Sequence, residues 1–368
     1  MRLSQEPFLR EKTRPAREVT MTAATLDAFL NSYTGKDDRL RPAVAATIRQ
    51  LATAAVKIRH VINQGVLGAA FAGTRGANAD GDIQKDLDVF ADDIFLDAMR
   101  HAPVALYASE ELERPVLLDG DAPLAIAIDP LDGSSNINTN VSIGTIFSLV
   151  PATGVPDANP AAAFLQAGTN QLGAGFFIYG PQLALVLSLG SGTHVFVLSA
   201  SLGVFVQAYE SRIIPERTQE FAVNAANYRH WDEAVRLYVD DCLKGSEGPR
   251  DRDFNMRWIA SLVADCYRIL IRGGVFLYPG DRRKGYHHGR LRLIYEANPI
   301  AYLIEQAGGA ATDTASRILE IVPEGLHQRT PVVFGSLREV HRISRYHADP
   351  SGIGDRAPLF GNRGLFRA

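Results

Sequence analysis

Two aspartates, Asp129 and Asp132, stand three residues apart directly after the apolar segment 124–128, which is typical of a buried β-strand. At the end of a strand both carboxylates can point at one small volume, and hard oxygen ligands of this kind suit Mg²⁺ or Mn²⁺. Residues 133–135, Gly-Ser-Ser, then offer N–H groups and hydroxyls to an anion, as does any helix that starts there. A turn with a serine cap explains the same residues, but the combination predicts metal-assisted phosphate chemistry.

Further carboxylates lie at the ends of other predicted strands. Glu110 and Glu111 follow the predicted strand 104–108, and Glu296 follows a predicted apolar strand at 293–295. Each one alone is explained equally well by a solvated turn. Ligands gather at strand ends in sheet-based enzymes, however, so we expect these carboxylates to converge.

Converging carboxylates repel one another and need cations to stay ionised together. Two or three divalent ions would neutralise them, and two metals about 4 Å apart can activate water and stabilise the leaving oxygen. Asp82, in a Gly-Asp turn, and Asp88, at the start of a predicted helix at 87–99, would orient or deprotonate that water. Ser134 and Ser135 are better suited to hold phosphate than to act as nucleophiles, because no Gly-x-Ser-x-Gly motif surrounds them.

The composition is that of an ordinary globular protein. The chain has 368 residues, 46% of them hydrophobic and 21% charged, and its net charge is 38 − 41 = −3. This charge gives no reason to expect nucleic acid or a membrane surface as partner. Two cysteines, Cys242 and Cys266, no apolar leader and no apolar run of membrane-spanning length predict a cytoplasmic protein without disulfides.

The order of predicted elements indicates an α/β or α+β enzyme in which helices and sheets form layers. We expect an N-terminal arm or short helix at 1–40, two α/β halves at 41–212 and 213–345, and a polar tail at 346–368. The first half contains a large, mostly antiparallel or mixed sheet, and the polar stretch after 335 has no predicted element. The predicted helices are 42–65, 87–99, 231–243, 258–271 and 298–307; the other predicted strands are 145–150, 173–179, 183–189, 195–198, 203–207, 275–279 and 331–335.

Several motifs resemble class I fructose-1,6-bisphosphatases in order and spacing. They cover the chain from about residue 43 to residue 337, and the Asp-Pro-x-Asp-Gly core alone is shared with inositol monophosphatases. The resemblance implies a layered αβαβα sandwich of the sugar-phosphatase type, usually a homotetramer, with two or three Mg²⁺ per subunit. The matching segments are 81–88, 109–111, 129–137, 144–147, 273–279, 291–299, 307–309 and 327–331.

The resemblance also implies roles for individual residues, and the reaction would be Mg²⁺-dependent hydrolysis of the 1-phosphate of fructose 1,6-bisphosphate by metal-activated water. Asp88 and Glu111 would assist the attacking water, Asp82 would lie near the loop that engages metal, and Arg257 would reach into a neighbouring subunit's site. The implied metal ligands are Glu110, Glu111, Asp129, Leu131 through its carbonyl, Asp132 and Glu296. The implied substrate contacts are Gly133, Ser134 and Ser135 for the 1-phosphate, with Asn224, Arg257, Tyr278 and Arg290 for the 6-phosphate and sugar.

Some positions depart from the family pattern. Arg290 stands where lysine is usual, and Trp258 replaces a tyrosine. Positions that bind inhibitory AMP in many relatives appear here as Pro123, Leu124 and Pro151, which have no basic or phenolic group, so we expect weak or absent AMP inhibition. No cysteine-bearing redox loop is present between residues 151 and 163, so control by thioredoxin is not expected.

The basic loop 281–290 has one expected functional residue, Arg290, whereas His287 and His288 are interpreted as part of a solvated turn. Two alternative activities remain open. A dual enzyme would also hydrolyse sedoheptulose 1,7-bisphosphate, since one hydroxymethylene unit changes discrimination by only about 1–3 kcal/mol. An inositol monophosphatase-type enzyme would have no use for Arg257, Tyr278 and Arg290, and its Trp-Asp-x-Ala motif is absent from the second half.

Overall fold

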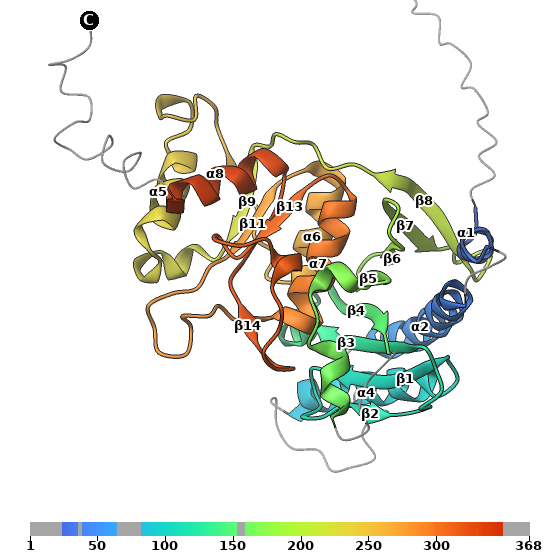
Figure 1. Ribbon diagram of the computed structural model, residues 1–368. Coiled ribbons are helices and arrows are strands. Elements are labelled where there is room, and N and C mark those ends of the chain that lie inside the picture. The colour runs from blue at the N-terminus through green and yellow to red at the C-terminus, as the bar shows by residue number, and fades with distance from the viewer. Residues whose placement is uncertain (1–23, 36–38, 65–81, 153–158, 349–368) are drawn as a thin grey trace, which may run out of the picture.

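The computed structural model describes residues 24–35, 39–64, 82–152 and 159–348, except for the side chains of residues 82–86 and 138. In these ranges two β-sheets alternate with three layers of helices, in the order helix, sheet, helix, sheet, helix (Figure 1). This is the αβαβα layering that the family resemblance implies. No helix in the described ranges is both long and apolar enough to cross a membrane.

The first sheet has eight strands in the described part of the chain. β1 and β3 pair in parallel, whereas every other pair of neighbours is antiparallel, so the sheet is mixed, as predicted. In order across the sheet the strands are β2 (Val116–Leu117), β1 (Val104–Ser109), β3 (Leu124–Asp132), β4 (Ile143–Pro151), β5 (Gly173–Tyr179), β6 (Leu183–Ser188), β7 (Thr193–Leu198) and β8 (Phe205–Arg212).

Burial on both faces explains the continuous apolar runs of these strands. On β5, Phe177 and Tyr179 belong to the core beneath α2 and α4, whereas Phe176 and Ile178 belong to the core on the opposite face. Because side chains alternate along a strand, an unbroken apolar run requires helices on both faces of the sheet. The outer face is covered by α1 (Leu26–Tyr33), α2 (Leu40–Ile62) and α4 (Asp82–Met99), and the inner face by α6 (Leu262–Arg272) and α7 (Asn298–Gln306).

The second sheet packs on the other side of α6 and α7 (Figure 1). Its far face is closed by α5 (Glu233–Leu243) and α8 (Leu337–Ala348) around a third core. Its strand order is β10 (Asn255–Met256), β9 (Glu220–Val223), β11 (Val275–Tyr278), β15 (Val332–Gly335) and β13 (Ala310–Thr312), and a separate pair joins β12 (Leu291–Arg292) to β14 (Arg329–Thr330).

Several sequence-based boundaries are wrong. The stretch after residue 335 forms helix α8, whose buried face contains only Val340, Ile343 and the polar Glu339, so its apolar periodicity is too sparse to detect. The helix expected at 258–271 begins at Leu262, because the preceding Ala260 has a left-handed backbone with φ of +65°. The helix expected at 87–99 already begins at residue 82. Of the two alternatives for the N-terminal region, a short helix is present as α1.

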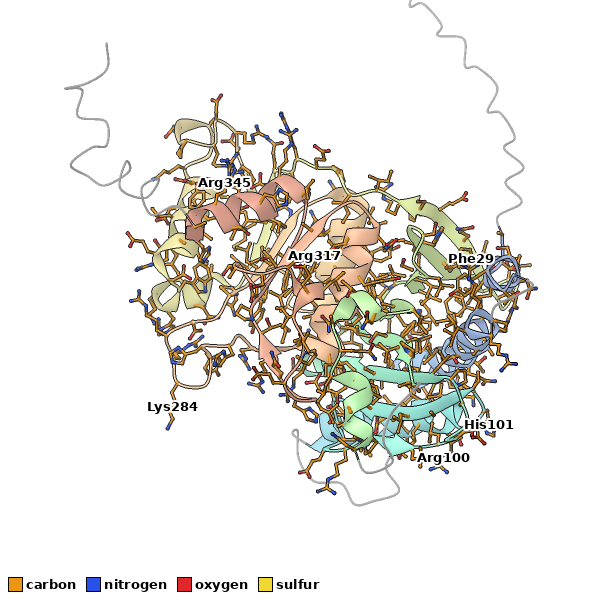
Figure 2. The ribbon with its side chains drawn as sticks, in the orientation of Figure 1. Phe29, Arg100, His101, Lys284, Arg317 and Arg345 are labelled. Carbon is orange, nitrogen blue, oxygen red and sulfur yellow. The ribbon has the colours of Figure 1, made fainter. Side chains whose placement is uncertain are left out.

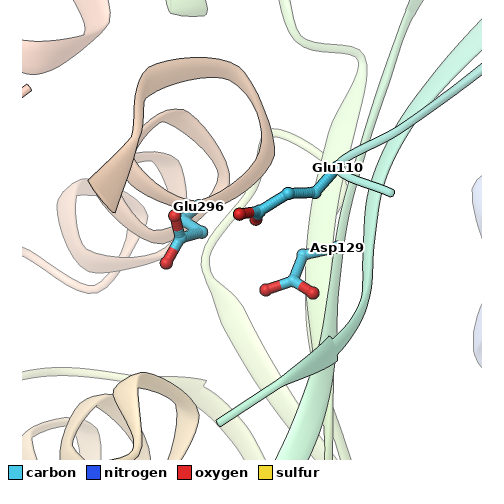
Figure 3. Close-up of side chains that lie close together, drawn as sticks. All are labelled: Glu110, Asp129 and Glu296. Carbon is cyan, nitrogen blue, oxygen red and sulfur yellow. The ribbon is translucent and has the colours of Figure 1, made fainter. Parts of the chain in front are cut away.

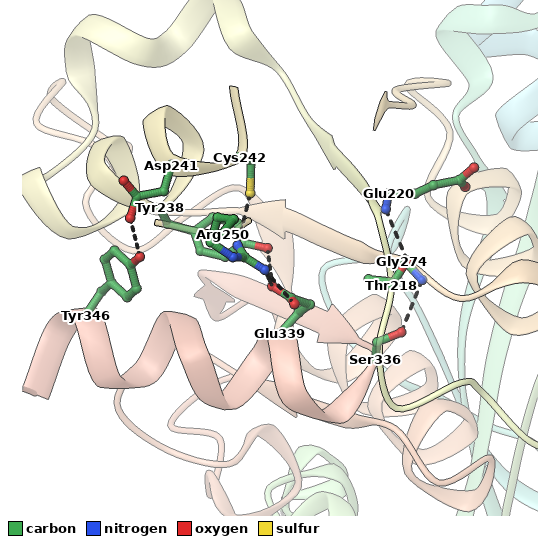
Figure 4. Close-up of polar contacts among 10 residues, drawn as sticks. All are labelled: Thr218, Glu220, Tyr238, Asp241, Cys242, Arg250, Gly274, Ser336, Glu339 and Tyr346. Atoms are coloured by element: carbon green, nitrogen blue, oxygen red, sulfur yellow. Dashed lines mark hydrogen bonds and ion pairs between the residues drawn. The ribbon is translucent and has the colours of Figure 1, made fainter. Parts of the chain in front are cut away.

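A buried ion pair joins α8 to the chain that follows α5 (Figure 4). Arg250 donates from Nη2 to both carboxylate oxygens of Glu339 at 2.7 Å, and the two side chains are only 2% and 5% exposed. The Tyr238 hydroxyl donates to the same carboxylate at 3.0 Å, and the Arg250 guanidinium lies 4.3 Å from the ring centroid of Phe254. The charged groups of the third core are therefore hydrogen-bonded to one another, as burial in an apolar environment requires.

Candidate active site

Three carboxylates from distant parts of the chain meet beside the end of β1 (Figure 3). Glu110, Asp129 and Glu296 each bring one oxygen within 4.8 Å of the others. The first two are neighbours because β1 and β3 run in parallel with Ser109 opposite Ile128, and the Glu110 N–H donates to the Ile128 carbonyl at 3.0 Å. Parallel pairing thus brings residues from two strand ends to one point, as expected from the sequence.

Glu296 reaches this point from a helix and not from a strand. The segment Leu293–Ala297, predicted as a strand followed by a turn, is a π-helix that continues into α7, and all five of its residues are buried. A short apolar run does not distinguish a strand from a buried helix, which is why the prediction is wrong. Single π-turns of this kind are frequent at functional sites, because they redirect a side chain within a helix.

Arg292 links two of the three carboxylates, and sequence reasoning missed it. Its main-chain N–H donates to Glu296 Oε2 at 2.5 Å, and its Nε donates to Glu110 Oε1 at 3.2 Å. Its Nη1 is bound in turn to the His327 carbonyl at 3.0 Å. Arg292 therefore fixes the orientation of both glutamates from one side. The signal in the sequence was a cation four residues before a candidate ligand.

Burial and mutual repulsion disfavour the ionised form of the carboxylates in this cluster. Burial, followed by the proximity of Glu110, raises the pKa values of Asp129 and Glu296 well above their usual range. Only oxygen ligands are present in the cluster, which is the donor set that Mg²⁺, Mn²⁺ or Ca²⁺ prefers over softer metals. The residues therefore fit a hard divalent cation.

Asp132 is buried next to this cluster and is bound to α6. The Val263 N–H donates to Asp132 Oδ2 at 3.0 Å, and burial raises the pKa of this carboxyl. The chain between the two aspartates departs from regular β pairing, and the Leu131 N–H donates to Asp129 Oδ1 at 3.0 Å. This irregular turn lets both carboxylates face the inner helical layer. A ligand role for the Leu131 carbonyl stays a prediction.

A second set of carboxylates, Asp88, Asp92 and Glu111, lies next to the cluster of Glu110, Asp129 and Glu296. Burial, then the charge of Glu111, raises the pKa of Asp88 to about 7, although a hydrogen bond with Ser134 opposes the shift. Burial, Glu110 and Asp92 raise the pKa of Glu111. Asp92 was missed by sequence reasoning, although it follows Asp88 by four residues on the same face of α4; it is buried and accepts a hydrogen bond from Tyr107 at 2.7 Å. The side chain of Asp82 lies outside the described part of the chain.

The Gly-Ser-Ser segment forms a tight turn followed by a short 3₁₀-helix, Ser134–Thr139. Gly133 has φ of +75°, a backbone conformation that glycine adopts without steric cost. Ser134 is half-buried and Ser135 is exposed, so both can be reached by a ligand. The Asn136 side-chain amide donates to the Ala260 carbonyl at 2.8 Å and thereby ties this turn to the chain before α6.

A separate pocket collects three of the predicted sugar-phosphate residues. Asn224, Tyr278 and Arg290 line one hollow that is open to solvent. Arg257 does not line it: this side chain is exposed and borders another hollow, beside β9 and β11. Trp258 stacks on Phe276 with ring centroids 5.5 Å apart. Sequence reasoning missed four further polar residues of the pocket, namely Asn227, Asp281, Arg283 and Tyr286.

The pocket and the carboxylate cluster are joined by a short piece of chain. Arg290 lines the pocket, and Arg292, two residues later, contacts Glu110 in the cluster. Their Cα atoms are therefore at most about 7 Å apart. Neighbouring residues of one chain segment thus line the pocket and contact the cluster.

Comparisons with known proteins agree on one family. Residues 22–210 match the model of the fructose-1,6-bisphosphatase N-terminal domain, and residues 214–348 match that of the C-terminal domain. A class 1 fructose-1,6-bisphosphatase from Rhizobium meliloti is 68% identical over 349 residues, which cover 95% of this chain and all of that protein. One from Azorhizobium caulinodans is 55% identical over 89% of this chain and all of that protein.

A solved structure shows the same fold. The holo form of Leishmania major fructose-1,6-bisphosphatase superposes with a TM-score of 0.80 at 31% sequence identity, covering 89% of this chain and all of that chain. The apo form gives a TM-score of 0.79 at 30% identity. Both halves of the sequence match the domain models of one family, and the fold matches a solved structure of a member. The chain therefore belongs to the class I fructose-1,6-bisphosphatase family.

Proposed function

We propose that this chain hydrolyses the 1-phosphate of fructose 1,6-bisphosphate, giving fructose 6-phosphate and inorganic phosphate. The observation that carries the proposal is the convergence of Glu110, Asp129 and Glu296, one short step along the chain from the pocket of Arg290. The cluster would hold the reacting phosphate through cations, and the pocket would hold the distal phosphate. The family membership of the chain supports the same substrate.

We propose Mg²⁺ as the resident metal, two or three ions per subunit, with Mn²⁺ as a substitute. When bound, the ions supply charge neutralisation, polarisation of the phosphoryl oxygens and a lowered pKa of water. Glu110, Asp129, Asp132 and Glu296 would hold them, with Glu111 and the Leu131 carbonyl as further ligands. In support, burial raises the pKa values of Asp129, Asp132, Glu296 and Glu111, and Glu110 has an oxygen within 4.8 Å of those of Asp129 and Glu296.

The chain's own groups would move the proton and hold the phosphate. Asp88, which lies beside Glu111, would accept a proton from the attacking water, assisted by Glu111. Asp82, at the start of α4, would help to orient the attacking water. The N–H groups and hydroxyls of the turn at Gly133, Ser134 and Ser135 would hold the 1-phosphate. Attack of water on phosphorus predicts that hydrolysis in H₂¹⁸O places one ¹⁸O atom in the released phosphate and none in the C1 hydroxyl of the sugar; label in the C1 hydroxyl would show cleavage of the C–O bond instead and contradict this attack.

Metal binding should stabilise the protein more strongly at higher pH. Without metal, folding raises the pKa of Asp88 from 3.8 to about 7. Between these pH values the folded state therefore binds more protons at Asp88 than the unfolded state does. The contribution of Asp88 to the free energy of unfolding thus falls as the pH rises from about 4 to 7. Metal ligands must be ionised, so protons compete with the ions. We expect 10 mM Mg²⁺ to raise the melting temperature more at pH 8 than at pH 6, measured by differential scanning fluorimetry. An equal shift at both values, or a shift unchanged in the Asp129→Asn variant, would contradict this site.

AMP should inhibit weakly or not at all by the usual route. Leu124, the first residue of β3, pairs with Pro151, the last residue of β4, and Leu124 is fully buried. Pro123, Leu124 and Pro151 have no charged group or hydroxyl with which to bind the phosphate of a nucleotide. A dose–response curve is expected to show less than 50% inhibition at 1 mM AMP. Tight inhibition that is lost on substitution near Pro123 or Pro151 would refute this prediction.

We propose that the enzyme is a cytoplasmic homo-oligomer, a homotetramer by family resemblance, in which Arg257 completes the site of a neighbouring subunit. This proposal is supported by the exposed Arg257 and by its exposed apolar neighbours Met256 and Ile259, next to the edge strand β10. Cys242 and Cys266 are unpaired and buried, as in proteins of a reducing compartment.

Mixed oligomers test this role of Arg257. Arg257→Ala should lower kcat/KM about 10- to 100-fold, the cost of a charge-assisted phosphate contact. Reassembly of Arg257→Ala subunits with inactive Asp129→Asn subunits should restore part of the activity, because each Arg257→Ala site then borrows an arginine. Activity equal to the sum of the two separate variants would show that Arg257 acts within its own chain or not at all.

A further inference from the structure

The pocket of Arg290 contains a second arginine to which no role is assigned above. Arg283 lies on the loop between β11 and β12 and lines the pocket together with Tyr286, Tyr278 and Asn224. We propose that Arg283 binds the distal phosphate of the substrate alongside Arg290, and that Tyr286 positions both guanidinium groups. This inference rests on the proposed function, because it names a further ligand of the same substrate.

Arg283 is fixed in place by groups of the pocket wall. Its Nε donates to both oxygens of Asp281 at 3.0 and 3.1 Å, and its Nη2 donates to Asn227 Oδ1 at 3.0 Å and also to Asp281. Asp281 is buried, at 9% exposure, which makes it a firm anchor. In the described part of the chain Nη1 makes no hydrogen bond, so its two N–H groups remain for a ligand.

Tyr286 contacts both arginines through its ring. The Arg283 Cζ lies 4.5 Å and the Arg290 Cζ 5.0 Å from the ring centroid. An aromatic ring attracts cations through its electron-rich face, which offsets part of the repulsion between two guanidinium groups held near one another. The Tyr286 carbonyl accepts hydrogen bonds from the N–H groups of Asp281 and Gly289, both at 3.0 Å, so the loop is closed on itself.

The charge of the pocket suits a phosphate dianion. Its titratable lining side chains include two arginines and one aspartate, 2 − 1 = +1, before the ligand arrives. Two planar guanidinium groups offer paired donors to phosphate oxygens, and the Tyr278 hydroxyl and the Asn224 amide lie in the same lining. Asp281 accepts hydrogen bonds from Nε and Nη2 of Arg283 and so orients the Nη1 donors toward a ligand. Because this carboxylate is already paired, it does not compete with the phosphate for Nη1.

Two cations on the same loop serve as controls. Arg282 is exposed and does not line the pocket, and its main-chain N–H donates to the His230 carbonyl at 3.2 Å. Lys284 projects from the loop away from the body of the protein (Figure 2). Removing the charge of Arg282 or Lys284 measures how much the general positive charge of the loop contributes to binding an anion. Removing the charge of Arg283 also removes the proposed contact with the distal phosphate.

The decisive experiment is calorimetric binding of fructose 6-phosphate, which has the distal phosphate alone, to the full-length protein and its variants. Arg283→Gln should raise Kd about tenfold or more, the expected cost of a charge-assisted hydrogen bond, and Arg282→Gln less than about twofold. Tyr286→Ala should weaken binding in the same direction, whereas Tyr286→Phe, which keeps the ring, should retain it. Binding of fructose 1-phosphate, which lacks the distal phosphate, should be unchanged in Arg283→Gln.

The outcomes separate this inference from the proposed function. Unchanged binding of fructose 6-phosphate by Arg283→Gln, equal losses for Arg282→Gln, or an equal loss for fructose 1-phosphate would overturn the inference. Failure of the unmodified protein to hydrolyse fructose 1,6-bisphosphate would instead overturn the proposed function. In turnover, the inference predicts that Arg283→Gln raises KM for the bisphosphate with little change in kcat, and a loss confined to kcat would contradict it.

Discussion

Replacing Asp129 with asparagine should lower the rate of phosphate release from fructose 1,6-bisphosphate by roughly 10³-fold, or about 4 kcal/mol of transition-state stabilisation. The amide has nearly the same shape as the carboxylate but no charge, and it binds hard cations poorly. Asp129 is buried and has an oxygen within 4.8 Å of oxygens of Glu110 and Glu296, so the substitution removes one of the three carboxylates of the cluster. The rate is measured as Mg²⁺-dependent phosphate release at saturating substrate.

The matched control is Asp97→Asn, which removes a carboxylate from an exposed position on α4. It should leave the rate within about twofold. Without metal, Asp129→Asn should be as thermally stable as the unmodified protein or more so, because repulsion from Glu110 and Glu296 is relieved. Persistence of turnover in Asp129→Asn would show that the carboxylate cluster is not the metal centre.

Replacing Arg250 with methionine should destabilise the protein by about 3–5 kcal/mol, because the Glu339 carboxylate would be left buried without its cation. Such a loss is a large share of a typical unfolding free energy of about 5–15 kcal/mol. The Tyr238 hydroxyl would remain as a partner of Glu339 but carries no charge. The free energy of unfolding is measured by urea denaturation of the metal-loaded protein.

Two variants show whether the effect comes from the unpaired charge. Arg338→Met breaks the exposed pair with Glu216, whose side chains are 54% and 59% exposed, and should cost less than about 1 kcal/mol. The double variant Arg250→Met with Glu339→Leu removes both buried charges and should recover most of the lost stability. A double variant as unstable as Arg250→Met alone would mean that packing, not the stranded carboxylate, decides the stability of this core.

The ligand-bearing strand ends were predictable because they depend on local patterns. The apolar runs before Glu110 and Asp129 fix two strands, and parallel pairing of those strands puts both residues at one edge. The layered fold was expected from the alternation of predicted helices and strands, and its αβαβα order from the family resemblance. Gly133 was likewise expected at a tight turn, where its φ is +75°.

What the sequence could not show depends on contacts between distant residues or on irregular backbone. The π-helix that carries Glu296 has the same short apolar run as a strand, and only its packing distinguishes the two. The hydrogen bond from the Val263 N–H to Asp132 joins residues 131 positions apart. Arg283 looked like part of a solvated loop, because its anchoring by Asn227 and its contact with Tyr286 follow no periodic pattern.

The most direct test of the account is Mg²⁺-dependent phosphate release measured in parallel from fructose 1,6-bisphosphate, sedoheptulose 1,7-bisphosphate, fructose 6-phosphate and inositol 1-phosphate. We predict rapid release from fructose 1,6-bisphosphate, little from either monophosphate, and loss of release on chelation of the metal. Comparable release from the sedoheptulose substrate would identify a dual enzyme. Preference for inositol 1-phosphate would contradict the account, because the pocket of Asn224, Tyr278 and Arg290 would then have no phosphate to bind.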